Sequence, residues 1–229
     1  MKNVVITGAA GNLGSAVVEK FLKSGYKVIA TVENEDQEKQ LPVNQNFEVR
    51  KINLGNEGEA TAFGQDLISK YGNIDAALML VGGFAMGDIS ATSGDDLKKQ
   101  YSLNFETAYF TARPFFTHMM QNNFGRLIFV GARPALDASA GKSMVAYALS
   151  KSLLFKLAEF LNASAKGKNV TATVFVPSTI DTPQNRKSMP DKDPDDWVKP
   201  SQIAELMEMV VSDTGTPLRE SVLKVYSNS

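Results

Sequence analysis

The sequence predicts an α/β protein built on one doubly wound parallel sheet of about seven strands with helices on both faces. Short apolar runs rich in β-branched residues alternate with longer helical patterns along all 229 residues. Parallel strands joined by helical crossovers produce this alternation, because each crossover must return the chain to the same edge of the sheet. No internal repeat, low-complexity tract or interdomain linker interrupts it, so we expect residues 1–229 to form a single domain.

The expected elements follow one another in regular order. Strands are predicted for the short apolar runs at residues 3–7, 27–32, 47–52, 75–81, 126–130, 171–176 and 222–226. Helices are predicted for the longer patterns at residues 12–24, 56–70, 93–122, 143–165 and 200–212. The stretch 177–199 is rich in Pro, Asp and Lys, and we expect an irregular substrate lid there, because long loops in compact domains are usually functional.

Composition restricts the classes of function. The net charge is −1 and Lys and Arg are scattered, which argues against nucleic-acid or anionic-membrane partners. The chain has no cysteine and a single histidine, His118, so thiolate zinc sites and His clusters are excluded and we expect no metal site. No apolar run reaches the roughly 18 residues of a membrane span, and the N-terminus enters a strand directly, so we expect a cytoplasmic protein.

A glycine-rich turn connects the first strand to the first helix, with the sequence Thr7-Gly8-Ala-Ala-Gly11-Asn-Leu-Gly14. Glycines here permit a tight turn and close packing of helix on strand, and the helix N-terminus presents free N–H groups to an anion. A structural turn is the simpler alternative. The position between a strand and a helix at the start of the chain favours dinucleotide binding.

Residues after the next three strands complete the expected cofactor site. Glu33 follows the second strand, where a carboxylate binds the adenosine ribose, and no Arg or Lys stands at 31–34 to receive a 2′-phosphate. This pattern favours NAD(H) over NADP(H). Asn53 and Leu54 lie where an adenine ring would sit, although Asn53 is equally typical of a turn. Gly82 marks a strand end where cofactor meets backbone.

Tyr147 and Lys151 are candidate catalytic residues. Their i, i+4 spacing places them on one face of the 143–165 helix. A nearby ammonium lowers the pKa of a tyrosine from about 10 toward the range that suits a general acid. The simpler alternative is an unrelated pair on a surface helix. Asn104, in the middle of the 93–122 helix, either faces solvent or breaks the helical ladder to hold a water molecule.

Four features occur in this order: the glycine turn, Asn104, Tyr147-x-x-x-Lys151 and Pro177-Ser-Thr-Ile-Asp-Thr182. Together they resemble the short-chain dehydrogenase/reductase family over essentially the whole chain. The resemblance implies a Rossmann-type sheet and hydride transfer to or from a nicotinamide. It further implies that Tyr147 donates a proton, that Lys151 binds ribose and lowers the tyrosine pKa, and that Asn104 anchors a relay water. It also implies cofactor contacts from Gly8, Asn12 and Leu13 at the pyrophosphate, and from Ile180 and Thr182, in the segment that starts at Pro177, at the carboxamide.

One departure from the family pattern is informative. The family's usual catalytic serine follows the fifth strand, where this chain has Ala132, which donates no hydrogen bond to a substrate carbonyl. Ser139, Ser143 and Ser178 are the hydroxyls that could replace it, and the sequence selects none of them. Several stretches resemble a group within the family that lacks this serine, the quinonoid dihydropteridine reductases: residues 75–85, 131–137 and 181–190, with Trp197 after them.

We therefore expect an NAD(P)H-dependent reductase of a quinonoid dihydropteridine or a similar planar heterocycle, a small-molecule substrate. Lid residues able to bond to or stack on such a ring are Asn185, Arg186 and Trp197. The alternatives are a carbonyl reductase or alcohol dehydrogenase of unknown substrate, and a non-catalytic dinucleotide-sensing regulator. Such reductases commonly pair through helices, and we expect a homodimer or homotetramer because the 143–162 helix has excess apolar surface from Val145, Leu149, Leu153, Leu154, Leu157, Phe160 and Leu161.

Overall fold

The computed structural model describes residues 1–228 and contains a seven-stranded, all-parallel sheet in the order β3-β2-β1-β4-β5-β6-β7. The strands are β1 (Asn3–Ile6), β2 (Lys27–Val32), β3 (Phe47–Lys51), β4 (Ala76–Met79), β5 (Phe124–Val130), β6 (Asn169–Pro177) and β7 (Val222–Val225). The predicted fold class is confirmed. The strand order reverses between β1 and β4, which is where ligands bind in sheets of this kind.

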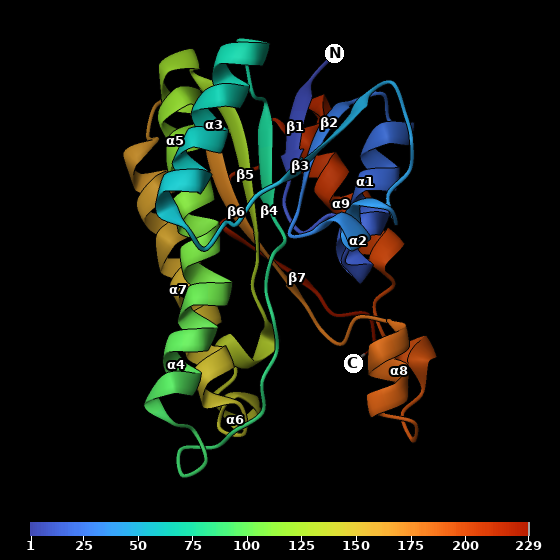
Figure 1. Cartoon of the computed structure of the whole chain (residues 1–229). Coiled ribbons are helices and arrows are strands. Elements are labelled where there is room, and N and C mark those ends of the chain that lie inside the picture. The colour runs from blue at the N-terminus through green and yellow to red at the C-terminus, as the bar shows by residue number, and fades with distance from the viewer. Residues whose placement is uncertain (229) are drawn as a thin grey trace.

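Helices cover both faces of the sheet (Figure 1). One face carries α3 (Glu57–Tyr71), α5 (Thr107–Asn122) and α7 (Val145–Ser164), and the other carries α1 (Asn12–Lys23) and α9 (Pro200–Val211). Each face has its own apolar core. Phe115 and Phe129 are fully buried in the first core, and Phe21 and Met207 are fully buried in the second. These close-packed layers fix the positions of the strand ends.

The first helix packs on the first strand through Gly14. A Cβ at this position would lie 2.1 Å from the carbonyl oxygen of Gly8, so only glycine allows the approach. Gly11 is the N-cap residue of α1, and within the described residues no side chain caps this helix end. Its first-turn N–H groups are therefore available to a ligand at the carboxyl edge of the sheet.

The helix predicted over 93–122 is not continuous. A π-helical turn at Ser102–Glu106 separates α4 (Gly94–Tyr101) from α5. The Thr107 N–H bonds the carbonyl oxygen of Ser102, five residues back, instead of one four residues back. The expectation of one regular α-helix is wrong here, because Asn104 inside the turn bonds to groups outside the helix.

The stretch 177–199, expected to be irregular, is more ordered than predicted. It contains α8 (Pro183–Ser188), whose first turn is capped by the Thr182 side chain. A threonine followed by a proline is a typical helix start, so this helix was predictable. Ile180 and Val198 pair as a β-bridge, which closes the stretch on itself.

Two one-turn helices, α2 (Glu35–Glu38) and α6 (Ala138–Gly141), lie where the sequence predicts none. In Figure 1, α4 and α6 form one lobe below the sheet, and α8 lies across from them. Across residues 1–228, no helix combines the length and the apolar character needed to cross a bilayer.

Candidate active site

A cavity of about 550 Å³ lies at the carboxyl ends of β1, β2 and β4, where the strand order reverses. Its size is within the usual range of small-molecule sites. The predicted cofactor residues that line it are Gly8, Gly11, Glu33, Asn53, Leu54 and Gly82. The sequence gives no signal for other lining residues, which include Gln37, Lys99, Ser102, Leu103 and Thr107, because tertiary packing brings them there. Asn12, Leu13 and Gly14 lie in the first turn of α1, outside the described lining.

Among the described lining residues, two ionisable side chains of opposite sign face the cavity. Glu33 is exposed after β2, and its backbone N–H donates to Gln37 Oε1 at 2.9 Å. Lys99 comes from α4. The sequence shows no Arg or Lys at positions 31–34, next to the expected ribose site. Lys99 reaches the same cavity from a different part of the chain.

Asn53 shapes a turn at the cavity wall. Its Oδ1 accepts a hydrogen bond from the Gly55 N–H at 3.1 Å, and its own N–H donates to Glu59 Oε2 at 3.2 Å. Asn53 therefore stabilises a turn, which is the alternative that its residue type suggests. Leu54 is buried beside it and contributes apolar surface to the cavity.

Tyr147 and Lys151 lie one turn apart on α7, as their spacing predicts. Lys151 is 5% exposed, and its Nζ donates to the carbonyl oxygen of Val130, at the end of β5, at 2.8 Å. Burial lowers the pKa of Lys151 to about 8. Burial also raises the pKa of Tyr147 to about 12, so the protein alone does not lower the tyrosine pKa as the resemblance implies.

Asn104 is fully buried in the π-helical turn, so the alternative of a solvent-facing asparagine is wrong. Its Oδ1 accepts from the Gly83 N–H at 2.9 Å, and its Nδ2 donates to the Gly83 carbonyl oxygen at 3.1 Å. Nδ2 also lies 2.9 Å from Gln100 Oε1 and 3.1 Å from Ser150 Oγ. Because Ser150 is on α7, Asn104 connects the segment after β4 to the helix that carries Tyr147.

Gly82 lies where these groups converge. A Cβ there would come 2.6 Å from Asn104 Oδ1 and 2.9 Å from Lys151 Nζ. Gly82 also lines the cavity, whereas Tyr147 and Lys151 lie next to it and outside the described lining. Phe84, two residues further on, contacts Tyr147 edge to face, with ring centroids 5.1 Å apart and planes at 73°.

The position of the family's usual serine holds Ala132, which is buried directly after β5 and adds no side-chain donor to the site. Ser178 Oγ donates to the carbonyl oxygen of Tyr226 at 2.9 Å. Ser139 is exposed on α6, and Ser143 is half-buried just before α7.

A model of the short chain dehydrogenase family matches residues 2–193. The chain belongs to the short-chain dehydrogenases. It is therefore an oxidoreductase of that family. This short-chain dehydrogenase is 26% identical over 232 residues to dihydropteridine reductase from Dictyostelium discoideum, an alignment covering 100% of this chain and 96% of the relative. It is 27% identical over 189 residues to acetoacetyl-CoA reductase from Acinetobacter sp. (strain RA3849), covering 80% of this chain and 75% of the relative.

Solved structures confirm the fold of this short-chain dehydrogenase. The structure of ElxO with NADP bound is similar with a TM-score of 0.90 at 19% identity, covering 98% of this chain and 96% of the other. Serine dehydrogenase from Escherichia coli is similar with a TM-score of 0.83 at 18% identity, covering 97% of this chain and 96% of the other.

In this short-chain dehydrogenase, two side chains of the stretch predicted to be a lid, Asn185 and Arg186, bond to other groups of the same stretch. Arg186 forms a bidentate ion pair with Asp181, with N–O distances of 2.6 and 2.9 Å. Asn185 Nδ2 donates to the carbonyl oxygen of Ile180 at 2.8 Å. Trp197 is 5% exposed and lies next to the Ile180–Val198 bridge, where residues 177–199 close on themselves. Its contact with a substrate ring stays a prediction.

Three predicted cofactor-binding residues lie from the end of β6 to the start of α8, and two of them, Ile180 and Thr182, are expected at the nicotinamide carboxamide. Pro177 ends β6 and pairs with Val225 of β7. Ile180 packs against the core under α9, and Thr182 is buried as the cap of α8. None of the three belongs to the described cavity lining, and their cofactor contacts stay a prediction.

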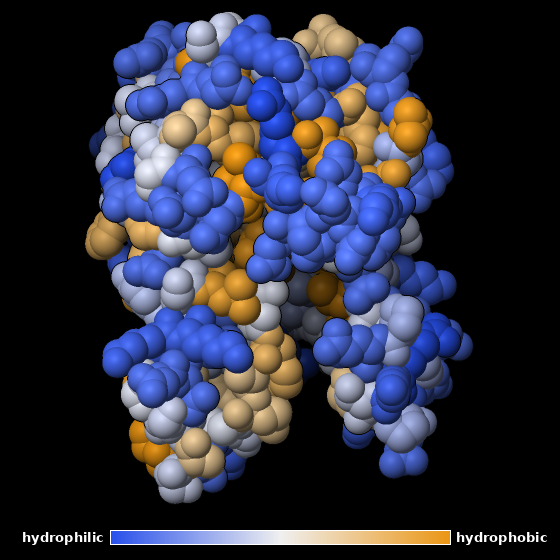
Figure 2. Space-filling model, viewed as in Figure 1, coloured by the Kyte–Doolittle hydropathy of each residue, from blue (hydrophilic) through white to orange (hydrophobic). Residues whose placement is uncertain are grey.

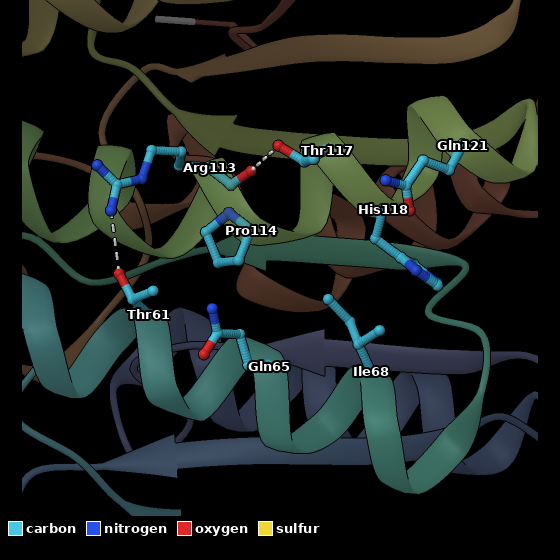
Figure 3. A pocket seen from close by; sticks show the side chains of 8 residues that line it. All are labelled: Thr61, Gln65, Ile68, Arg113, Pro114, Thr117, His118 and Gln121. Atoms are coloured by element: carbon cyan, nitrogen blue, oxygen red, sulfur yellow. Dashed lines mark hydrogen bonds between the residues drawn. The ribbon is translucent and has the colours of Figure 1, made fainter.

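A second cavity, of about 420 Å³, lies in the groove between α3 and α5 (Figure 3). Arg113 donates to Glu57 Oε1 at 2.6 Å and to Thr61 Oγ1 at 3.1 Å at one end of the groove. At the other end, His118 Nε2 accepts from the Ile74 N–H at 3.3 Å. Its lining residues come from neither the glycine turn nor α7, so this groove is separate from the candidate active site.

Proposed function

We propose that this short-chain dehydrogenase uses NAD(P)H to reduce a quinonoid dihydropteridine or a similar planar heterocycle. The observation that carries the proposal is Ala132 at the serine position of a chain that keeps Tyr147 and Lys151. Reduction of a ketone concentrates charge on one oxygen, which needs preorganised donors. A quinonoid ring spreads that charge, so one proton from Tyr147 is enough. Similarity to dihydropteridine reductase over the whole chain supports the proposal.

The residues fit a nicotinamide dinucleotide. The cavity is bordered by Gly8 and Gly11, next to a helix N-terminus that suits a pyrophosphate. A Cβ at Gly82 would come 2.6 Å from Asn104 Oδ1 and 2.9 Å from Lys151 Nζ, so only the bare backbone lets the lysine lie this close to the cavity wall. When bound, the dinucleotide supplies the hydride. The NADP in the similar structure of ElxO supports this assignment.

The site residues have distinct parts in the proposed reaction. Tyr147, with its pKa raised to about 12, stays protonated at neutral pH and donates its proton to the substrate atom that receives charge. Lys151 carries mostly positive charge below its pKa of about 8 and binds the ribose hydroxyls. Asn104 fixes Gly83, and in the proposed reaction it anchors the relay water.

Ala132→Ser tests the proposal. We expect it to leave heterocycle reduction within about twofold of wild type and to raise ketone reduction by roughly tenfold, because a new donor helps only the localised oxyanion. The measurement is kcat/KM with NADH for a quinonoid dihydropterin and for an acetoacetyl thioester. Ala135→Ser, three residues away in the following turn, is the control. Equal changes on both substrates would contradict the assigned role of Ala132.

The second candidate is a carbonyl reductase. Similarity to acetoacetyl-CoA reductase favours it, and so does Ser143, a half-buried hydroxyl just before α7. The wild-type protein would then prefer the acetoacetyl thioester, and Ser143→Ala would abolish that activity. A non-catalytic nucleotide sensor finds no support in a chain that keeps Tyr147 and Lys151 and belongs to an oxidoreductase family.

For the cofactor, the finer proposal is a preference for NADH. The Glu33 carboxylate repels a 2′-phosphate, so NADH should bind more tightly than NADPH by about 1 kcal/mol, or roughly fivefold. Glu33→Gln should reduce the difference in affinity between the two cofactors, because it should strengthen the binding of NADPH. Lys99→Gln is the control, because it removes a positive charge instead of a negative one. It should weaken the binding of NADPH. Fluorescence titration of both cofactors measures the difference, and equal or reversed wild-type affinities would contradict the preference.

For assembly, we propose a two-fold homodimer. Of the apolar residues predicted on α7, Leu154 and Leu157 are buried in the core, whereas Leu149, Leu153 and Phe160 are exposed. Tyr101 on α4, which packs against α7, and Tyr109 on α5 are further exposed aromatic residues. Light scattering at micromolar concentration should give a dimer mass, and the double variant Leu149→Glu/Phe160→Glu should be monomeric. A monomeric wild-type protein would rule the dimer out.

A further inference from the structure

The segment that follows β4 is pinned against the start of α7. Asn104 holds both backbone groups of Gly83, at 2.9 and 3.1 Å. Further along, the Gly87 N–H donates to the carbonyl oxygen of Ser143 at 3.0 Å, and the Gly87 carbonyl oxygen accepts from the Val145 N–H at 2.8 Å. The chain between these two anchors, residues 84–86, therefore has a defined path beside α7.

Large apolar side chains on this pinned segment stay in solvent. Phe84 is 61% exposed although its ring contacts Tyr147, and Met86 is 66% exposed. Leaving such side chains in water forgoes the free energy of burying them, and exposed apolar patches mark binding surfaces. A substrate that takes a proton from Tyr147 must come within hydrogen-bond reach of its hydroxyl. The rest of that substrate then lies close to Phe84.

The α8 lobe, which lies across the gap from the α4–α6 lobe, is polar rather than apolar. The charged and amide groups of Arg186 and Asn185 are bonded within the lid, and Trp197 is buried. Figure 2 shows hydrophobic colours on the side of the α4–α6 lobe that faces the gap, whereas the α8 lobe across the gap is largely hydrophilic. Polar recognition by the lid would require breaking its internal bonds, whereas contact with Phe84 requires no rearrangement.

We propose that Phe84 is a specificity-determining residue that holds the flat, unsaturated ring of the substrate beside Tyr147. The inference rests on the proposed function, in which Tyr147 is the proton donor, and it names the surface that selects the substrate. Aromatic side chains bind planar rings by stacked or edge-to-face contact. The favoured ligand class is a planar heterocycle of low charge, rather than an acyclic 3-oxoacyl chain that offers no ring face.

The test measures binding of pterin, a stable, fully aromatic ring, to the NAD⁺-saturated protein by pterin fluorescence. Phe84→Ala should weaken pterin binding by roughly fivefold or more, and Phe84→Trp should keep it within about twofold. Ile89→Ala is the matched control, because Ile89 is an apolar side chain of the same segment that is 83% exposed. It should bind pterin as the wild type does. The NAD⁺ affinity of all variants should stay unchanged.

Wild-type affinity in Phe84→Ala, an equal loss in Ile89→Ala, or no pterin binding by the wild type would each overturn the inference. A turnover assay with a quinonoid dihydropterin and NADH separates it from the proposed function. If pterin binding depends on Phe84 but the quinonoid ring is not reduced, the proposed reaction is wrong and the ring-binding role of Phe84 stands. If the ring is reduced and Phe84→Ala binds pterin normally, the reaction stands and the inference fails.

Discussion

Tyr147→Phe is expected to lower kcat for the preferred substrate by roughly 100-fold or more, the range typical of lost general acid catalysis. The substitution removes only the hydroxyl. The phenyl ring that remains keeps the edge contact with Phe84, and the ring centroids there are 5.1 Å apart. Because the wild-type pKa of Tyr147 is raised to about 12, the group is a proton donor throughout the neutral range. Stopped-flow and steady-state rates with NADH would measure the loss.

The control for this variant is Tyr109→Phe, which removes the hydroxyl of an exposed tyrosine on α5. It should turn over as the wild type does. Thermal unfolding and NADH titration of both variants should match the wild type, because neither change touches the core or the dinucleotide cavity. If Tyr147→Phe kept full turnover, Tyr147 and Lys151 would be a structural pair and the assigned mechanism wrong.

Lys151→Ala is expected to weaken NADH binding by roughly tenfold or more and also to lower kcat, because hydrogen bonds to a charged group contribute about 1.5–3 kcal/mol. The wild-type pKa of Lys151 is lowered to about 8, so the ammonium is fully present below that pH and is lost above it. The kcat/KM of the wild type for NADH should therefore fall as pH rises through about 8, since this ratio reports the free enzyme.

Lys156→Ala is the matched control, since it removes a lysine from an exposed position of α7 where Lys156 pairs with Glu159. It should retain NADH affinity, kcat and the same pH profile. A Lys151→Ala variant with unchanged NADH affinity would remove Lys151 from the cofactor site. If kcat/KM of the Lys151→Ala variant still fell near pH 8, Lys151 would likewise be excluded from the cofactor site.

The sheet was predictable because the strands other than β3 are short apolar runs, and the observed ends lie within two residues of the predicted ones. The π-helical turn was not predictable, since side-chain bonds from Asn104 to Gly83 and Ser150, which are distant in sequence, stabilise it together with a local bond to Gln100. Thr182 and Pro183 indicate the start of α8, whereas the Pro, Asp and Lys composition of residues 177–199 favours a loop.

The candidate site also contains residues that were predictable from the sequence and residues that were not. The glycine turn, Glu33 and the Tyr147–Lys151 pair follow from local spacing, and the structure places them as expected around one cavity and one helix face. Lys99 and Phe84 belong to elements whose orientation depends on packing, so spacing gives no sign of them. Trp197 is buried, so the predicted contact with a substrate ring requires residues 177–199 to move.

The most direct measurement is the ratio of kcat/KM values for two substrates of the wild-type protein, a quinonoid dihydropterin and an acetoacetyl thioester, with NADH as reductant. We predict a ratio of at least roughly 100 in favour of the quinonoid ring, because the site supplies one proton donor and lacks the serine that a localised oxyanion requires. A ratio below 1, with efficient reduction of the thioester, would contradict the proposed function and identify a carbonyl reductase.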